Sequence, residues 1–380
     1  MEITAFKKHF QRVYQQEATA VSLAPGRVNL IGEHTDYNGG FVLPCALRFK
    51  TKVAFRERDD RIVRVTSLNY NNEQVSFNID EPLVPGNCHW ANYIMGVYFS
   101  FLAKGYDLRG ADLLVSGNVP QGAGLSSSAA LEVAVAGAIA AQNQLPLSPT
   151  DIALLGQYTE NHFLDCQTGI MDQMISAHAK KDHALLLDCQ DLSSRHIPVH
   201  KDLRLLIVNS NFKRALVGSE YNQRRTDCEE AASSLGVPSL RHATLEQVTA
   251  GQVRMSKNAF KRAMHVVSEN DRTLSAAQAL EKNDFNTLRE LMFASHDSLR
   301  DNFEVTVPAT DYLVEIIKCE AGKSGAARMT GGGFGGAVVA LLMPDVVERV
   351  VSAVLQQYPK QVNIIPDIYE CEPGEGMHII

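Results

Sequence analysis

The sequence has few cysteines that could form disulfides, no long apolar run that could span a membrane and no basic run that could bind nucleic acid. Its seven cysteines are scattered over 380 residues and never form a C-x-x-C pair, which argues against a disulfide framework and a zinc site. No apolar run reaches the roughly 18 residues of a membrane-spanning helix, and residues 1–16 read as an amphipathic helix without a signal-peptide core. With 36 basic and 43 acidic residues, the net charge is −7 and no Lys/Arg run favours nucleic acid. We therefore expect a cytoplasmic protein with a small-molecule ligand.

Low-complexity segments and internal repeats are also missing, and the predicted elements alternate irregularly. Predicted strands lie at 50–58, 61–68, 111–117, 183–189, 203–211, 326–330, 337–343 and 368–373. Predicted helices lie at 90–105 and 344–358, in a stretch that opens at Ser148-Pro149, and over most of 219–321. This order favours an α+β fold over a regular doubly wound sheet. No Pro/Gly/Ser linker marks a boundary; we place one near residue 190, which gives domains 1–190 and 191–380.

The first motif is NVPQGAGLSSSAALEVAVAG, residues 118–137. It follows a predicted strand with a glycine-rich turn and a helix whose first residues are serines, an arrangement that holds phosphate on backbone N–H groups and the positive end of the helix dipole. It is neither a Walker loop, because Ala123 stands at the lysine position, nor a dinucleotide loop, because Ser127 stands at the last glycine position. It therefore predicts another kind of phosphate loop, with serines that can reach Mg²⁺; the alternative is a plain capped helix behind a turn.

The second motif is APGRVNLIGEHTDYNGG, residues 24–40. Arg27, Glu33, His34 and Asp36 crowd into ten residues between glycines. We interpret the segment as a loop for a polyhydroxylated ligand, because each hydroxyl needs both a donor and an acceptor. A solvated turn with local side-chain bonding is the alternative.

The third motif is ENHFLDCQTGIMDQMISA, residues 160–177. It places Glu160 and Asp172 at its two ends with Gly169 between them. Alternating apolar residues after Asp172 indicate a partly buried carboxylate, which needs a partner; an ordinary helix cap is the alternative.

The fourth motif is RMTGGGFGGAVVALL, residues 328–342. It satisfies G-x-G-x-x-G formally, but a predicted strand follows it instead of a helix, so it does not predict a dinucleotide site. A tight turn packed beside another loop or a ligand is the better interpretation.

Taken together and in this order, the four motifs resemble the GHMP kinases. GRVNLIGEHTDYNGG and NVPQGAGLSSSAALE are similar in particular to the galactokinase branch, and SNFKRALVGSEYNQRR (210–225) resembles a segment of the same branch, so the similarity covers most of the chain. The resemblance implies two domains, an N-terminal mixed sheet with helices and a C-terminal antiparallel sheet with helices, with the active site in the cleft between them.

The resemblance also implies the site residues. In this family the loop wraps the nucleotide phosphates without a P-loop lysine, and Ser128 and Glu160 bind Mg²⁺, for which hydroxyl and carboxylate oxygens are suitable ligands. Arg27 and Asp172 would flank the hydroxyl that attacks the γ-phosphate. ATP contacts are implied for Ser67, Gly122, Ala123, Gly124, Leu125, Ser126, Ser127 and Ser128. Sugar contacts are implied for Glu33, His34, Thr35, Asp36, Gly169 and Tyr221.

The expected activity is transfer of the γ-phosphate of Mg·ATP to the anomeric hydroxyl of D-galactose, by a monomer. One alternative is a kinase for a related sugar such as N-acetylgalactosamine. Another is a sugar- and ATP-binding sensor that has lost catalysis, against which the intact Arg27, Ser128, Glu160 and Asp172 argue.

Overall fold

The computed structural model describes residues 2–212 and 217–380. Its helices are α1 (Ile3–Tyr14), α2 (His89–Ala103), α3 (Ser127–Gln142), α4 (Pro149–Tyr158), α5 (Met171–His178), α6 (Val217–Leu235), α7 (Leu245–Gly251), α8 (Lys257–Glu281), α9 (Phe285–Ser298), α10 (Pro308–Ala321) and α11 (Pro344–Val362). Residues 213–216 of the family-like segment 210–225 lie outside this description. No helix among the described residues is long and apolar enough to cross a membrane.

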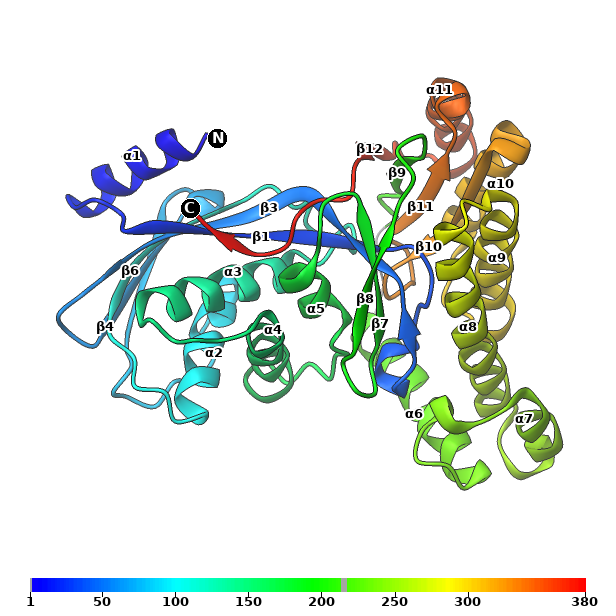
Figure 1. Cartoon of the computed structure of the whole chain (residues 1–380), viewed down its shortest axis with the longest axis horizontal. Coiled ribbons are helices and arrows are strands. Elements are labelled where there is room, and N and C mark those ends of the chain that lie inside the picture. Colours follow the sequence, from blue (N-terminus) through cyan, green and yellow to red (C-terminus); the bar gives the residue numbers. More distant parts are fainter. Residues whose placement is uncertain (1, 213–216) are drawn as a thin grey trace.

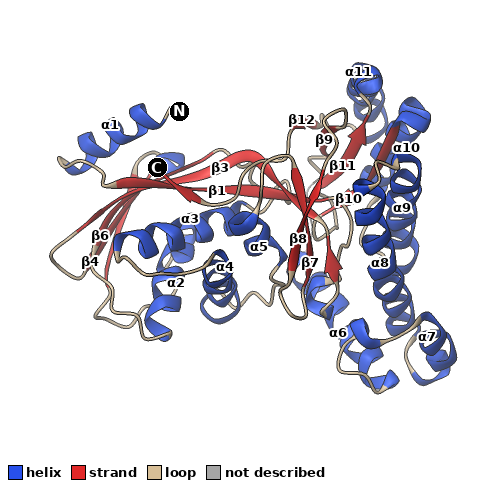
Figure 2. Cartoon of the chain, viewed as in Figure 1, coloured by secondary structure: helices blue, strands red, loops and turns tan. Residues whose placement is uncertain are grey.

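The strands form three sheets, shown in red in Figure 2. Six form a mixed sheet in the order β13 (His378–Ile379), β1 (Ala20–Asn29), β3 (Pro44–Glu57), β6 (Ala111–Gly117), β4 (Ile62–Ser67) and β5 (Glu73–Asn78). Four form an antiparallel sheet in the order β10 (Gly325–Thr330), β11 (Ala337–Leu342), β9 (Arg204–Asn209) and β12 (Asp367–Cys371). The third sheet has the order β2 (Phe41–Val42), β7 (His183–Asp188) and β8 (Ser194–Pro198). The predicted α+β class, with a mixed and an antiparallel sheet, is confirmed.

The mixed sheet is covered on both faces, as Figure 1 shows, by α1 on one side and α2 to α5 on the other. Strand alternation explains this: Val21 and Leu23 of β1 pack against Phe6 and Phe10 of α1, whereas Ala24 joins the core under the other helices. Among the described residues only β4 and β6 pair in parallel, and the crossover that joins them contains α2. Burial on both faces makes this sheet a rigid support for the loops at its edge.

The antiparallel sheet is also buried on both faces. Leu205 and Ile207 of β9 belong to a core with residues of α8 and α9, while Leu206 and Val208 belong to a core with α10 and α11. This region confirms the mainly helical stretch and the four strands predicted around it.

Three parts of the mixed sheet differ from the sequence-based expectation, the first being the edge strand β5, which was not predicted. The second motif was interpreted as a loop, but its first six residues belong to β1, where the pairing with β3 shifts register between Pro25 and Arg27. Proline and glycine are tolerated there because a bulge needs no regular ladder bond. The short β13 was not predicted; it pairs with β1 and returns the end of the chain to the first sheet. The boundary near residue 190 stays a prediction.

Candidate active site

Two cavities lie on either side of the loop that precedes α3. The aromatic cavity is lined by Thr51, Ser67, Asn69, Tyr70, His89, Trp90, Tyr93, Val115, Gly117, Val119, Gln121, Ser127, Ser128 and Leu131. The polar cavity, of about 390 Å³, is lined by Arg27, Glu33, His34, Asp36, Glu160, Asp165, Cys166, Gln167, Thr168, Gly169, Met171, Asp172, Tyr221, Asn222, Gly331 and Gly332. A third space, the loop hollow, is lined by Arg27, Pro120, Gly122, Gly124, Leu125, Ser126, Ser127, Ser128, Asp172 and Gly332.

The loop hollow shares lining residues with both cavities. Ser127 and Ser128 line the hollow and the aromatic cavity, whereas Arg27, Asp172 and Gly332 line the hollow and the polar cavity. The three spaces therefore form one row, in which an elongated ligand could extend from the aromatic cavity over the loop to a second ligand in the polar cavity.

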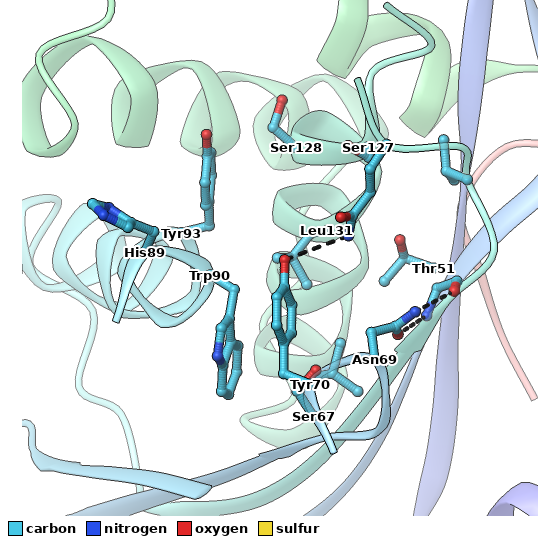
Figure 3. A pocket seen from close by; sticks show the side chains of 14 residues that line it. Thr51, Ser67, Asn69, Tyr70, His89, Trp90, Tyr93, Ser127, Ser128 and Leu131 are labelled. Atoms are coloured by element: carbon cyan, nitrogen blue, oxygen red, sulfur yellow. Dashed lines mark hydrogen bonds between the residues drawn. The ribbon is translucent and has the colours of Figure 1, made fainter. Parts of the chain in front are cut away.

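The aromatic cavity offers a surface for a flat ring. The rings of Tyr70 and Trp90 are nearly parallel, at 12° and 5.7 Å between centroids, and Figure 3 shows them beside the start of α3 with Ser127 and Ser128. The indole N–H of Trp90 donates to Glu73, 2.8 Å away, which fixes the ring. Asn69 exchanges two hydrogen bonds with the backbone of Gly117 and so ties the end of β4 to β6. The predicted Ser67 belongs to this wall.

The loop itself presents the N-terminus of α3 to the hollow. Gly122 and Gly124 both have φ of 74°, and Ser126 has φ of 56° just before the helix. No side chain caps α3, so its first N–H groups remain available for an anion, as expected of a phosphate loop. Gly26 allows the loop to approach β1, because a Cβ there would lie 2.6 Å from the carbonyl oxygen of Leu125.

Arg27 and Asp172 meet where the hollow joins the polar cavity. The guanidinium of Arg27 donates from Nε to Oδ1 of Asp172 at 2.7 Å and from its terminal nitrogen to Oδ2 at 2.8 Å, a bidentate geometry that fixes both groups. Arg27 also donates to the carbonyl of Gly124 at 2.6 Å, and the hydroxyl of Ser126 donates to Asp172. β1, α5 and the phosphate loop are thus joined at one carboxylate.

The polar cavity has an unpaired imidazole nitrogen. His34 accepts or donates a hydrogen bond at Nδ1 with the Tyr37 hydroxyl, 3.0 Å away, while its buried Nε2 has no partner among the described residues. Burial lowers the pKa of His34 well below its usual range, so the ring is neutral. Its φ of 62° is left-handed, a conformation that costs a non-glycine residue roughly 1–3 kcal/mol and recurs at functional sites.

The two carboxyl groups of the second motif, Glu33 and Asp36, differ in their hydrogen bonds and in their pKa. Glu33 is almost fully buried and its Oε1 accepts from the N–H of Gly331 at 2.8 Å and from the hydroxyl of Thr330 at 3.0 Å. It therefore ties the second motif to the glycine-rich fourth motif as well as lining the cavity. Burial, and then the nearby charge of Asp172, raise the pKa of Asp36 to about 7.

Ser128 lines the loop hollow, and Glu160 lines the adjoining polar cavity. Glu160 belongs to a π-helical turn, Thr159–Phe163, and its Oε2 accepts from the Gln173 amide at 3.2 Å and from the Thr168 hydroxyl. Burial raises the pKa of Glu160, and the hydrogen bond from Thr168 acts against this shift. Among the described residues no group of three or more His, Cys, Asp or Glu could hold a metal alone. One carboxylate and one hydroxyl fit Mg²⁺ only as part of a shell completed by phosphate oxygens and water.

Two residues named from the resemblance have their side chains elsewhere. The hydroxyl of Thr35 donates to the carbonyls of Gly32, at 2.9 Å, and of Phe41 within its own turn, and it lines none of the three spaces. Ala123 is buried in a hydrophobic core. The predicted contacts of Thr35 with the sugar and of Ala123 with ATP stay predictions; their side chains support the turn and the loop. The other predicted residues lie in the row.

The sequence reasoning missed Tyr70 and Trp90, which no spacing marks, and Gly331 and Gly332, whose motif was recognised without a role. Of these, the glycines could have been found from the sequence, because their turn was expected to pack beside another loop. It packs beside the loop that precedes α3: a Cβ on Gly331 would lie 3.3 Å from the carbonyl oxygen of Gly124.

Comparison with known proteins identifies the family. The galactokinase galactose-binding signature matches residues 5–57, the GHMP kinase N-terminal domain matches 92–180 and the GHMP kinase C-terminal domain matches 276–360. A galactokinase from Lactococcus lactis, solved in complex with galactose, is 34% identical, with a TM-score of 0.93 and 99% of each chain covered.

More distant relatives share the fold. A Methanococcus jannaschii mevalonate kinase is 17% identical with a TM-score of 0.66, covering 93% of this chain and 98% of the other. A D-glycero-D-manno-heptose 1-phosphate kinase from Bacteriodes thetaiotaomicron is 15% identical with a TM-score of 0.63, covering 95% and 98%. The chain belongs to the GHMP kinase family and, within it, to the galactokinases.

Proposed function

We propose that this protein transfers the γ-phosphoryl group of Mg·ATP to the anomeric hydroxyl of D-galactose, giving galactose 1-phosphate and ADP. The observation that carries the proposal is the position of the Arg27–Asp172 pair, which lines both the loop hollow and the polar cavity. A phosphate held on the loop and a sugar held in the cavity would meet at this pair.

On the nucleotide side, the aromatic cavity takes the adenine and the loop takes the phosphates. The parallel rings of Tyr70 and Trp90 support stacking of a base, and the uncapped start of α3 supports binding of the β- and γ-phosphates. Mg²⁺ would be held by Ser128 and Glu160 together with phosphate oxygens and water, and when bound it offsets negative charge on the phosphates.

On the sugar side, His34, Asp36 and Tyr221 line the polar cavity, and Nε2 of His34 has no hydrogen-bond partner among the described residues. The Lactococcus lactis galactokinase was solved with galactose bound, and its 34% identity over the whole chain supports the same substrate here. Discrimination among sugars follows from unpaired buried groups, because a hydroxyl of the wrong configuration leaves them without a partner.

In the reaction, the anomeric oxygen forms a bond to the γ-phosphorus as the bond between that phosphorus and the β–γ bridging oxygen breaks, and ADP leaves with the electron pair. The hydroxyl proton passes to a carboxylate oxygen of Asp172. Arg27, fixed by its two bonds to Asp172, stabilises charge on the transferring group, which is greatest in the transition state. We place the reaction in the cytoplasm and in a monomer, and the seven free cysteines are compatible with a reducing compartment.

The test is a coupled ADP-release assay with Mg·ATP over galactose, N-acetylgalactosamine, glucose and mannose. We expect galactose to be used with a kcat/KM at least about 100-fold above that for glucose, which differs only at C4. A higher kcat/KM for N-acetylgalactosamine would identify that sugar as the substrate instead of galactose. Sugar binding without ADP release from any of the sugars would identify a sensor. Comparable kcat/KM for glucose and galactose would contradict the proposal.

A further inference from the structure

The turn that carries the sugar-facing residues rests on one face of α8, and Figure 1 shows this long helix standing beside the end of β1 and β2. Four side chains of α8 are polar and buried on this face: His265, Glu269, Asn270 and Thr273. Their spacing places them on a single side of the helix. Buried polar side chains require partners, and here three of them find partners in the backbone of residues 32–41.

Two contacts hold the beginning of the turn. Oε1 of Glu269 accepts from the backbone N–H of Gly32 at 3.0 Å. Nε2 of His265 donates to the backbone carbonyl of Glu33 at 3.1 Å. Because both contacts are made to the main chain, they fix the path of the turn whatever its side chains do.

A third contact holds the end of the turn. Oδ1 of Asn270 accepts from the backbone N–H of Phe41 at 2.9 Å. Gly40 allows this approach, since a Cβ there would overlap with the same oxygen. The residues that line the polar cavity, His34 and Asp36, lie between the two held ends.

The protonation states suit these roles. Burial alone would raise the pKa of Glu269, but the Arg272 and Arg328 guanidinium groups bring it to about 2, so Glu269 is an ionised and therefore strong acceptor. Burial lowers the pKa of His265 to about 4. The neutral ring donates from Nε2 and accepts at Nδ1 from the Ser298 hydroxyl, 2.9 Å away.

We propose that His265, Glu269 and Asn270 are positioning residues of the sugar site: they hold the main chain of residues 32–41 from behind and keep His34 left-handed at the wall of the polar cavity. None of the three lines that cavity, so they act through the turn. The inference rests on the proposed function for its sugar readout, but its structural content, the backbone contacts, does not.

The experiment uses matched pairs in the full chain. Asn270→Leu removes the acceptor for Phe41 and Asn270→Asp keeps it; His265→Leu removes the donor for Glu33 and His265→Gln keeps one. Loss of one buried hydrogen bond predicts about a tenfold increase in the galactose KM for each Leu variant. We expect the Asp and Gln variants to recover most of that loss, and the affinity for ATP to stay at the wild-type value in all four.

A control separates positioning from general stability. Phe293→Leu alters a buried residue in the core with α10 and α11, and it should lower the melting temperature without changing the galactose KM. An equal KM increase in Phe293→Leu, or unchanged KM values in both Leu variants, would overturn the proposal.

Amide hydrogen exchange tests the backbone contact directly. The Phe41 amide should exchange about tenfold faster in Asn270→Leu than in wild type or Asn270→Asp. This readout is valid even if galactose is not the substrate. Accelerated exchange in a protein that fails the kinase assay would contradict the proposed function but support the backbone contacts from α8. Equal exchange rates in Asn270→Leu and wild type would contradict the positioning role of Asn270, whatever the activity.

Discussion

The carboxylate of Asp36 occupies the space that a side chain at Gly169 would need. A Cβ built on Gly169 would overlap with the carboxylate, so the second and third motifs meet here in the wall of the polar cavity. Glycine at this position therefore determines where Asp36 can lie.

We predict that Gly169→Ala displaces Asp36 and increases the galactose KM by about tenfold or more, with a much smaller effect on ATP binding, because a buried hydrogen bond to the sugar is lost. Steady-state kinetics with varied galactose is the measurement. The double variant Gly169→Ala/Asp36→Ala should be little worse than Asp36→Ala alone, since both changes remove the same contact. Fully additive effects would show that Gly169 acts independently of Asp36.

Asp36 also makes the stability of the sugar-free protein depend on pH. A carboxyl whose pKa rises from 3.8 unfolded to about 7 folded gives stability below its unfolded pKa that is lost as the pH rises through about 7. Asp36→Asn should therefore increase the free energy of unfolding at pH 8 by up to about 4 kcal/mol, which a higher melting temperature would show. At pH 4 the substitution should have little effect. Asp59→Asn, at an exposed turn, is the control; a pH-independent effect of Asp36→Asn would contradict the assignment.

The residues that could be found from sequence alone were those with a local signal. Glycines before an alanine-rich stretch predicted a turn followed by a helix, and in the structure that helix begins at Ser127; the binding of phosphate there stays a prediction. The Arg27–Asp172 pair joins residues 145 apart, and no periodicity encodes such a contact; only the family resemblance supplied it. Tyr70 and Trp90 come from a short turn and a helix whose meeting depends on the sheet between them, so reasoning from the residues alone could not pair them.

The supporting residues were missed for a related physical reason. Glu33 was expected to contact the sugar, and the structure shows that it also bonds Thr330 and Gly331 of β10 and the following turn. His265, Glu269 and Asn270 look in sequence like the polar face of a surface helix, yet they are buried. A polar stripe indicates solvent only when nothing polar packs against it, and here the main chain of a largely buried turn does.

Glu160 tests the metal site. We predict that Glu160→Ala lowers turnover by at least about 100-fold and increases the Mg²⁺ concentration needed for half-maximal activity, because one of two protein ligands is lost. Galactose alone should still bind. Asp165→Asn removes a neighbouring carboxylate of the polar cavity and should leave the Mg²⁺ requirement unchanged. An unaltered Mg²⁺ dependence in Glu160→Ala would exclude Glu160 as a ligand.

Asp172 and Arg27 test the chemical step. An amide at position 172 can still orient a hydroxyl but cannot take its proton, so Asp172→Asn should lose about 10²–10⁴-fold in kcat while the protein stays folded. Arg27→Ala should lose kcat with a smaller change in the galactose KM, because its main interaction is made in the transition state. Arg27→Lys keeps the charge without the bidentate geometry and should recover only part of the loss.

Binding controls are needed because both residues are also structural. The chain has one tryptophan, and Trp90 lines the aromatic cavity, so its fluorescence reports ATP binding in each variant while thermal unfolding reports the fold. If Asp172→Asn binds ATP and galactose normally and turns over near the wild-type rate, Asp172 is not an essential proton acceptor. Phosphoryl transfer through a loose transition state needs little activation of the nucleophile; in that case the bonds from Arg27 and Ser126 to Asp172 would serve to place the hydroxyl in line with the phosphate, and the proton would leave by another route.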